Sequence, residues 1–207
     1  MTSHTSPREA DPVHAVEQVA TRAAMHALGE RLATLLRAGD LVLLTGDLGA
    51  GKTTLTQGIG AGLGVRGPIT SPTFVIARVH PSEVAGPPLV HVDAYRLGSI
   101  AEVEDLDLEA SLDEAITVVE WGEGLVEGLA EDRLHVHLVR PRGQVSANGP
   151  GSDGPGSDAA GSDAPGPDGD PEDTGEESDD VPRMVRVEGV GPRWLGVDLM
   201  GSAGAGA

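Results

Sequence analysis

Apolar residues recur along this chain at two different spacings. Between residues 13 and 37 the spacing is helical, with Met25, Leu28, Leu32, Leu35 and Leu36 three or four positions apart or adjacent. This predicts an amphipathic helix over 13–37 that ends at Gly39-Asp40. Short continuous or alternating apolar runs predict strands, and they lie at 41–44, 73–79, 87–92, 116–119, 133–140 and 183–187. Helices between strands indicate an α/β domain with a mostly parallel sheet, and the last two alternating runs predict an antiparallel edge hairpin.

One strand-to-helix junction carries a glycine-rich motif, G-x-x-x-x-G-K-T, between the apolar run 41–44 and a helix expected over 52–63. Its glycines allow successive backbone N–H groups to face a phosphate, and the helix start adds the positive end of its dipole. We expect Lys52 to reach the β- and γ-phosphates and Thr53 to bind Mg²⁺. The motif predicts a P-loop NTPase-like three-layer sandwich with these nucleotide-binding residues: Gly46, Asp47, Leu48, Gly49, Ala50, Gly51, Lys52, Thr53 and Thr54.

Lys52 is the only lysine among 14 basic residues, and the other 13 are arginines. A compact ammonium fits a tight loop that would not admit the planar guanidinium of arginine. The same count excludes the Asn-Lys-x-Asp motif by which GTPases recognise guanine, because that motif would need a second lysine. Gly58, Gly60 and Gly62 weaken the helix 52–63 in isolation, and we expect them to allow close packing on the sheet.

Two carboxylates follow apolar runs beyond the motif. Asp93 comes about 40 residues after it, where a Walker-B acid is expected, and Glu120 ends the run 116–119. Strand ends converge on the ligand crevice of a parallel sheet, so both side chains can face the phosphates, one on the metal and one on the attacking water. Which of them contacts the metal stays open. Ser71 and Thr73 form either a switch-like segment that senses the γ-phosphate or a plain turn. His91 can orient the site, although a packed strand residue is the preferred interpretation.

Composition narrows the function classes. The formal net charge is −19, but 11 acidic and no basic residues lie between 144 and 180, so the remainder carries −19 + 11 = −8. No basic footprint for nucleic acid is present, which argues against DNA as a partner. The chain has no cysteine, which excludes disulfides and thiolate metal sites. We find neither a signal peptide nor an apolar run as long as a membrane span, and we expect a cytoplasmic protein.

Composition also divides the chain. Residues 1–12 are expected to be a disordered lead, and 13–140 plus 183–198 a single P-loop ATPase domain. The segment 141–182 is almost entirely Gly, Ser, Asp, Pro, Ala and Glu, with Gly-Ser-Asp repeated every five residues. It cannot bury enough apolar surface to offset its ordering entropy, so we expect a disordered acidic insertion within the hairpin. Residues 199–207 are expected to form a flexible tail.

These motifs together resemble the TsaE family, the bacterial ATPase of tRNA threonylcarbamoyladenosine biosynthesis. The resemblance covers roughly residues 20 to 140 and rests on Leu28-Gly29, the P-loop, Ser71-Pro72-Thr73-Phe74, His91-Val92-Asp93-Ala94-Tyr95-Arg96-Leu97 and Val119-Glu120-Trp121. It implies an enzyme that binds ATP and Mg²⁺ and hydrolyses ATP slowly. It also implies TsaB and TsaD as partners that modify adenosine 37, with tRNA reached only through the complex.

The resemblance also assigns roles to single residues. Thr53 and Glu120 become metal ligands, Asp93 the Walker-B acid and Thr73 the switch residue, while Trp121 lies near the nucleotide. The expected catalytic set is Lys52, Asp93, Glu120 and Thr73, and the expected metal set is Thr53, Glu120 and Asp93. A small-molecule P-loop kinase and a nucleotide-gated binding module without turnover are the alternatives.

Overall fold

In a computed structural model of the chain, residues 13–72, 76–97, 99–104, 108, 112–140 and 182–200 are described. The predictions for 1–12, Thr73, 141–181 and 201–207 lie outside these residues. The described elements are β1 Val13–Val19, α1 Arg22–Ala33, β2 Leu41–Gly46, α2 Lys52–Leu63, β3 Ala77–His80, β4 Leu89–Asp93, η1 Ala94–Arg96, α3 Ile100–Glu104, β5 Ile116–Glu120, η2 Glu127–Leu129, β6 Arg133–Val139, β7 Arg183–Val190 and η3 Pro192–Trp194.

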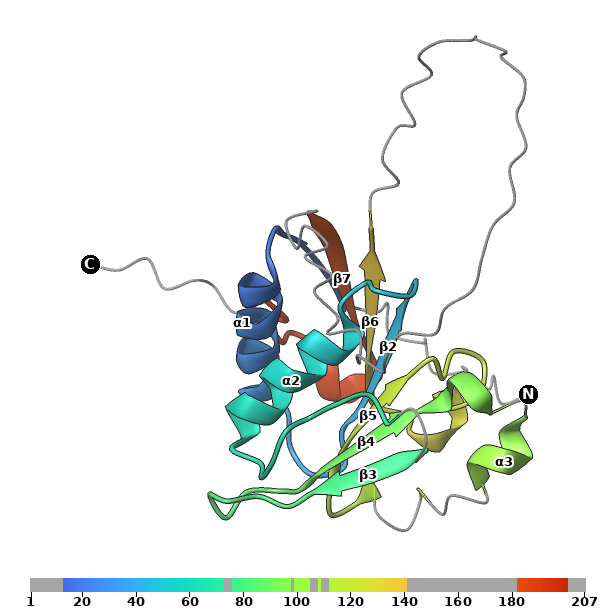
Figure 1. Cartoon of the computed structure of the whole chain (residues 1–207). Coiled ribbons are helices and arrows are strands. Elements are labelled where there is room, and N and C mark those ends of the chain that lie inside the picture. Colours follow the sequence, from blue (N-terminus) through green and yellow to red (C-terminus); the bar gives the residue numbers. More distant parts are fainter. Residues whose placement is uncertain are drawn as a thin grey trace, which may run out of the picture. The chain divides into compact units, whose positions relative to one another are not determined.

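The seven strands form one sheet in the order β1-β7-β6-β2-β5-β4-β3 (Figure 1). Strand β2 lies at its centre and pairs in parallel with β5 and β6, and β4 is parallel to β5. The pairs β6–β7, β1–β7 and β3–β4 are antiparallel. The expected α/β sandwich and the antiparallel hairpin are therefore confirmed. The hairpin does not lie at the edge of the sheet, because β1 pairs with the outer side of β7, and the sheet is mixed, with three parallel and three antiparallel strand pairs. The P-loop strand lies in the middle, so the carboxyl ends of β4, β5 and β6 all come near the loop.

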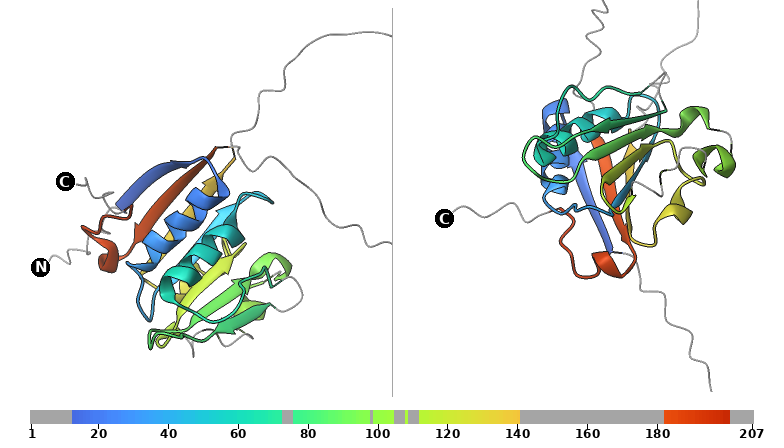
Figure 2. Two further views of the ribbon diagram at one scale, coloured as in Figure 1. Left: turned by 60° about the vertical axis from the view of Figure 1, so that its left-hand side comes forward. Right: turned by 90° about the horizontal axis from the view of Figure 1, so that it is seen from below.

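Helices α1 and α2 run side by side on one face of the sheet (Figure 2, left). Residues 41 to 44 of β2 are fully buried and alternate between two cores. Val42 and Leu44 join the core under α1 and α2, and Leu41 and Leu43 join a second core with Val103 of α3. A strand covered on both faces has a continuous apolar sequence, which explains why its position was plain from the sequence.

The prediction of one helix over 13–37 is wrong in its first part. Residues Val13–Val19 form β1, and α1 begins only at Arg22, with Thr21 as its N-cap: the Thr21 hydroxyl accepts a hydrogen bond from the Ala24 N–H at 3.1 Å. Valines favour strands, and β1 pairs with the side of β7 that would otherwise be an open edge. Pairing with a strand more than 160 residues away outweighed the local helical spacing.

The glycines of α2 do not face the sheet: Gly58 and Gly62 face α1, and Gly60 faces the segment after α2. A Cβ built on Gly58 would lie 2.1 Å from the His26 carbonyl oxygen, and one built on Gly29 would lie 2.4 Å from the Leu55 carbonyl oxygen. Gly60 faces the Ile69 side chain instead. The expectation of close packing holds, but its partner is α1, because only hydrogen-sized side chains allow the two backbones to approach this closely. At the other end of the chain, Leu199 is 2% exposed in the core, so the expected tail does not begin there.

Candidate nucleotide-binding site

The loop between β2 and α2 has the backbone that its glycines predict. Gly49 and Gly51 have φ values of 72° and 103°, in the left-handed region that disfavours side chains. Gly46 ends β2 so close to β6 that an added Cβ would lie 2.4 Å from the Leu138 carbonyl oxygen. Helix α2 then begins at Lys52, as the sequence predicted. The loop therefore forms a tight turn at the end of the central strand β2, and helix α2 begins directly after it.

The ammonium of Lys52 lies inside this loop. Its Nζ donates hydrogen bonds to the carbonyl oxygens of Gly46 at 2.8 Å and Asp47 at 3.1 Å, and it lies 3.6 Å from the centre of the Trp121 ring. Lys52 is only 5% exposed, and this burial lowers the pKa of its ammonium, while Glu120, Asp93 and Asp47 act in the opposite direction. A partly desolvated cation held among carboxylates is suited to bind the oxygens of a phosphate chain.

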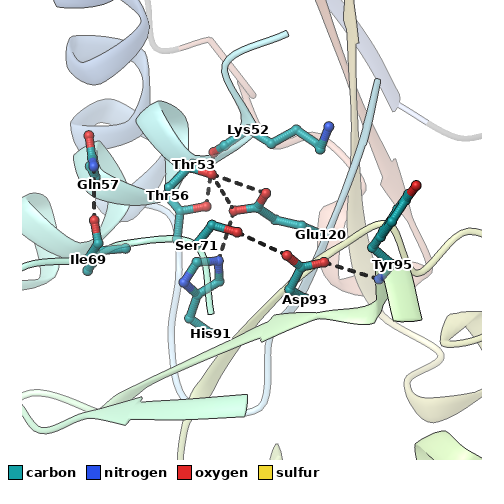
Figure 3. Close-up of polar contacts among 10 residues, drawn as sticks. All are labelled: Lys52, Thr53, Thr56, Gln57, Ile69, Ser71, His91, Asp93, Tyr95 and Glu120. Atoms are coloured by element: carbon teal, nitrogen blue, oxygen red, sulfur yellow. Dashed lines mark hydrogen bonds and ion pairs between the residues drawn. The ribbon is translucent and has the colours of Figure 1, made fainter. Parts of the chain in front are cut away.

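Glu120 connects the loop to the sheet (Figure 3). It ends β5, is 2% exposed, and accepts hydrogen bonds from the Thr53 hydroxyl at 3.1 and 3.3 Å. His91 Nε2 of β4 lies 2.9 Å from Glu120 Oε1, and His91 is fully buried. The carboxylate is therefore fixed from two sides, by the first turn of α2 and by the neighbouring strand.

Asp93 lies beside Glu120, because the register of β4 and β5 pairs these two residues directly. Its Oδ2 accepts a hydrogen bond from the Ser71 hydroxyl at 2.9 Å, and its Oδ1 accepts one from the Tyr95 N–H at 3.1 Å (Figure 3). Ser71 thus brings the segment before Thr73 to the Walker-B position. Each of the two carboxylates has its own donors, which keeps two like charges in adjacent positions.

Trp121 has a left-handed backbone, with φ at 63°, and turns its ring over the loop. Tyr95 meets this ring edge-on, with the two ring centres 5.3 Å apart. Next to Trp121 is an open pocket of about 580 Å³. Residues of the loop, of β6 and of the segment after β5 line it: Thr45, Gly46, Asp47, Trp121, Glu123, His137, Leu138 and Val139. A non-glycine residue in this conformation is costly, so it marks a position where the ring direction matters.

The structure thus brings together Lys52, Thr53, Asp93, Glu120 and Trp121, which the sequence placed in one site. Thr73 lies outside the described residues. The preferred interpretation of His91 as a packed strand residue was incomplete, because its ring also contacts Glu120, in line with the alternative that it orients the site. A signal for it existed, because His91 and Asp93 are two positions apart on one strand and therefore lie on the same face of the sheet.

The donor atoms fit a magnesium ion. A hydroxyl and one or two carboxylates, completed by phosphate oxygens and water, are the ligands that Mg²⁺ takes beside nucleotides. Among the described residues no group of three or more His, Cys, Asp or Glu side chains has a geometry that would hold a metal. A P-loop magnesium needs no such cluster, because the phosphates supply part of its coordination shell. Within the same residues no helix is long and apolar enough to cross a membrane.

Comparisons with known proteins agree with this geometry. The model of the family described as "Threonylcarbamoyl adenosine biosynthesis protein TsaE" matches residues 19–146. A Streptomyces coelicolor protein named tRNA threonylcarbamoyladenosine biosynthesis protein TsaE is 52% identical over 181 residues, which are 87% of this chain and 100% of that protein. The protein of the same name from Bacillus subtilis is 38% identical over 115 residues, 55% of this chain and 70% of the relative.

The fold comparison points the same way. The crystal structure of Bacillus subtilis YdiB superposes with a TM-score of 0.57 at 26% identity, and the match covers 93% of this chain and 92% of that one. The family match begins at the end of β1 and includes the P-loop, Asp93 and Glu120. The chain therefore belongs to the TsaE family.

Proposed function

We propose that this chain is a Mg²⁺-dependent ATPase subunit that binds ATP and hydrolyses it slowly, in support of the threonylcarbamoylation of adenosine 37 in tRNA. Family membership supports the place in this pathway. The partners would be TsaB and TsaD, with tRNA reached only through the complex. The proposed hydrolysis of ATP is supported by the residues of the site.

The contact between Thr53 and Glu120 carries this proposal. It brings the hydroxyl that follows the P-loop lysine to a buried carboxylate at the end of β5, with Asp93 as the next residue across the sheet. A motif that matched by chance would not place an acid from a strand 67 residues away against this hydroxyl. The arrangement matches what phosphoryl transfer requires, a phosphate cradle next to oxygen ligands for a metal.

Each group then has a distinct task. The loop N–H groups and Lys52 would hold the β- and γ-phosphates and stabilise the charge of the transition state. A bound Mg²⁺ would supply positive charge that offsets the negative charge of the phosphates. Thr53 and Glu120 would hold it, while Asp93 either completes the metal site or orients the attacking water. Thr73, two positions after Ser71, would sense the γ-phosphate.

The test is ATP hydrolysis with Mg²⁺ by the wild type, Lys52→Ala and Glu120→Gln, each with and without a co-purified TsaB–TsaD pair. We expect hydrolysis that the pair stimulates and that both substitutions abolish. Glu83→Gln is the matched control, because Glu83 is an exposed carboxylate whose nearest cation, Arg66, is 3.8 Å away at the surface. Phosphate release that survives Lys52→Ala would refute the P-loop mechanism. Tight ATP binding without turnover, even with the pair, would make the chain a nucleotide-gated binding module.

A further inference from the structure

Two arginines come from the β6–β7 pair, on the other side of β2 from β5. In the register of β6 and β7, the last residue of β6, Val139, lies opposite Met184. Arg140 directly follows Val139, and Arg183 directly precedes Met184 as the first residue of β7. Two cations brought to the same end of a strand pair repel each other unless other groups compensate their charge.

No described residue accepts a hydrogen bond from either guanidinium group. Arg183 is only 6% exposed, and the Nε atoms of both arginines are buried without a hydrogen-bond partner. The Nε atoms of Arg193 and Arg133 are unpaired as well, but their Nη atoms have acceptors: Arg193 donates to Asp40 and to the Leu35 carbonyl, and Arg133 donates to the carbonyls of Glu127 and Ala130. A buried cation without an acceptor destabilises the folded chain, so Arg183 is suited to pair with an anion.

Both guanidinium groups lie against the P-loop. A Cβ built on Gly49 would lie 3.7 Å from Arg140 Nη1, and one built on Gly51 would lie 3.8 Å from Arg183 Nε. Both of these glycines have left-handed backbones. The arginines therefore approach the loop next to β6 and β7, whereas Glu120 and Asp93 approach it next to β5 and β4.

From this arrangement we infer that Arg140 and Arg183 form a second anion site, which binds phosphate groups of the nucleotide that the P-loop holds. The inference rests on the proposed function and deepens it, because it assigns two phosphate-binding residues outside the P-loop motif. The planar, forked guanidinium suits a phosphate with two oxygens in reach, and it keeps its charge when buried. Binding the nucleotide would pair both cations at once.

The experiment measures binding by calorimetry for three ligands: ADP with Mg²⁺, inorganic tripolyphosphate and adenosine. The variants are Arg183→Met and Arg140→Met, which keep an unbranched apolar stem and remove the charge. Arg186→Met is the matched control, because Arg186 lies on the same strand but points outward, with its side chain 51% exposed. Hydrogen bonds to charged groups are strong, so we expect ADP and tripolyphosphate to bind about 10- to 100-fold more weakly to Arg183→Met. Adenosine binding and the control should not change.

Thermal unfolding without ligand separates this function from a structural one. Removing an uncompensated buried charge should leave the melting temperature of Arg183→Met equal to that of the wild type or raise it. A lower melting temperature together with unchanged ADP affinity would overturn the inference in favour of a structural role. Weaker adenosine binding with unchanged tripolyphosphate binding would also overturn it, because the arginine would then contact the base.

Failure of the inference can be told apart from failure of the proposed function. A wild type that binds neither ADP nor tripolyphosphate would refute the proposed function, and the inference with it. Wild-type binding that Lys52→Ala removes but Arg183→Met and Arg140→Met leave intact would overturn the inference alone.

Discussion

On one side of the P-loop strand, β5 and β4 end in Glu120 and Asp93. On the other side, β6 and β7 place Arg140 and Arg183 against the same loop. Each acid accepts hydrogen bonds from two groups of the protein itself: Thr53 and His91 for Glu120, and Ser71 and the Tyr95 N–H for Asp93. The Nε atoms of both arginines are buried without an acceptor, and neither guanidinium donates a hydrogen bond to a described residue.

This difference between the acids and the arginines shows two ways in which a binding site can be arranged before its ligand arrives. Side chains held by internal hydrogen bonds are preorganised, so they lose little freedom when a metal binds. A buried cation without a partner is instead destabilising until an anion arrives, so it couples binding to stability. The following predictions test each side and the loop between them, from the largest expected effect to the smallest.

Lys52→Arg tests the loop that both sides share. The substitution keeps the charge, but a planar guanidinium does not fit where an ammonium lies 2.8 Å from one carbonyl and 3.6 Å from a ring centre. We expect ATP hydrolysis to fall roughly 100- to 1,000-fold, the range for losing one group that stabilises transition-state charge. Steady-state phosphate release measures it. Activity close to that of the wild type would show that charge alone suffices here.

His91→Ala tests the acidic side. It leaves a cavity and removes a partner of a buried carboxylate, so we expect the free energy of unfolding to fall by about 2–4 kcal/mol. Urea titration measures this, and ATP hydrolysis should need more Mg²⁺, because Glu120 loses its orientation. His91→Gln should partly restore the magnesium dependence, since its amide nitrogen can reach the position of Nε2. Equal magnesium curves for the wild type and His91→Ala would mean that the histidine serves packing alone.

Ser71→Ala removes a single donor from Asp93. A hydrogen bond of this kind contributes about 1 kcal/mol, so we expect a three- to tenfold loss of ATP hydrolysis with little change in stability. Ser82→Ala is a suitable control, because the Ser82 hydroxyl only accepts local N–H groups in the turn before β4. If Ser71→Ala is as active as the control, the Asp93 contact has no part in catalysis.

Two histidines on opposite sides of β2, the buried His80 and the half-buried His135, allow a comparison by pH. Burial lowers the pKa of both His80 on β3 and His135 on β6 below the usual 6.5. The unfolded chain then binds more protons than the folded one as the pH falls below 6.5, so stability declines there and is fully retained above it. We expect urea unfolding between pH 7.5 and 5.5 to show this decline, and His80→Gln or His135→Gln to flatten it. His26 on α1, whose side chain is 39% exposed, gives the control variant His26→Gln. A slope equal to the control's in both variants would contradict the assignment.

The sequence by itself determined the elements around the P-loop. Strand β2 and helix α2 were predicted within a residue or two of where they lie, because a continuous apolar run and a glycine-rich motif are local signals. The positions of Asp93 and Glu120 at neighbouring strand ends followed from parallel packing, and the register confirmed that they are adjacent. A phosphate-binding site built from one turn and two strand ends can thus be predicted from the sequence.

Tertiary structure alone decided the rest. Residues 13–19 became a strand because β7 offered an edge, Gly58 faces α1 because the helices cross there, and His91 contacts Glu120 because their strands are adjacent. Arg140 and Arg183 are 43 positions apart in sequence, and only the pairing of β6 with β7 brings both of them to the P-loop. The spacing of apolar residues reflects how a segment packs locally. It does not show which distant strand a segment pairs with, or whether a buried cation has an anionic partner.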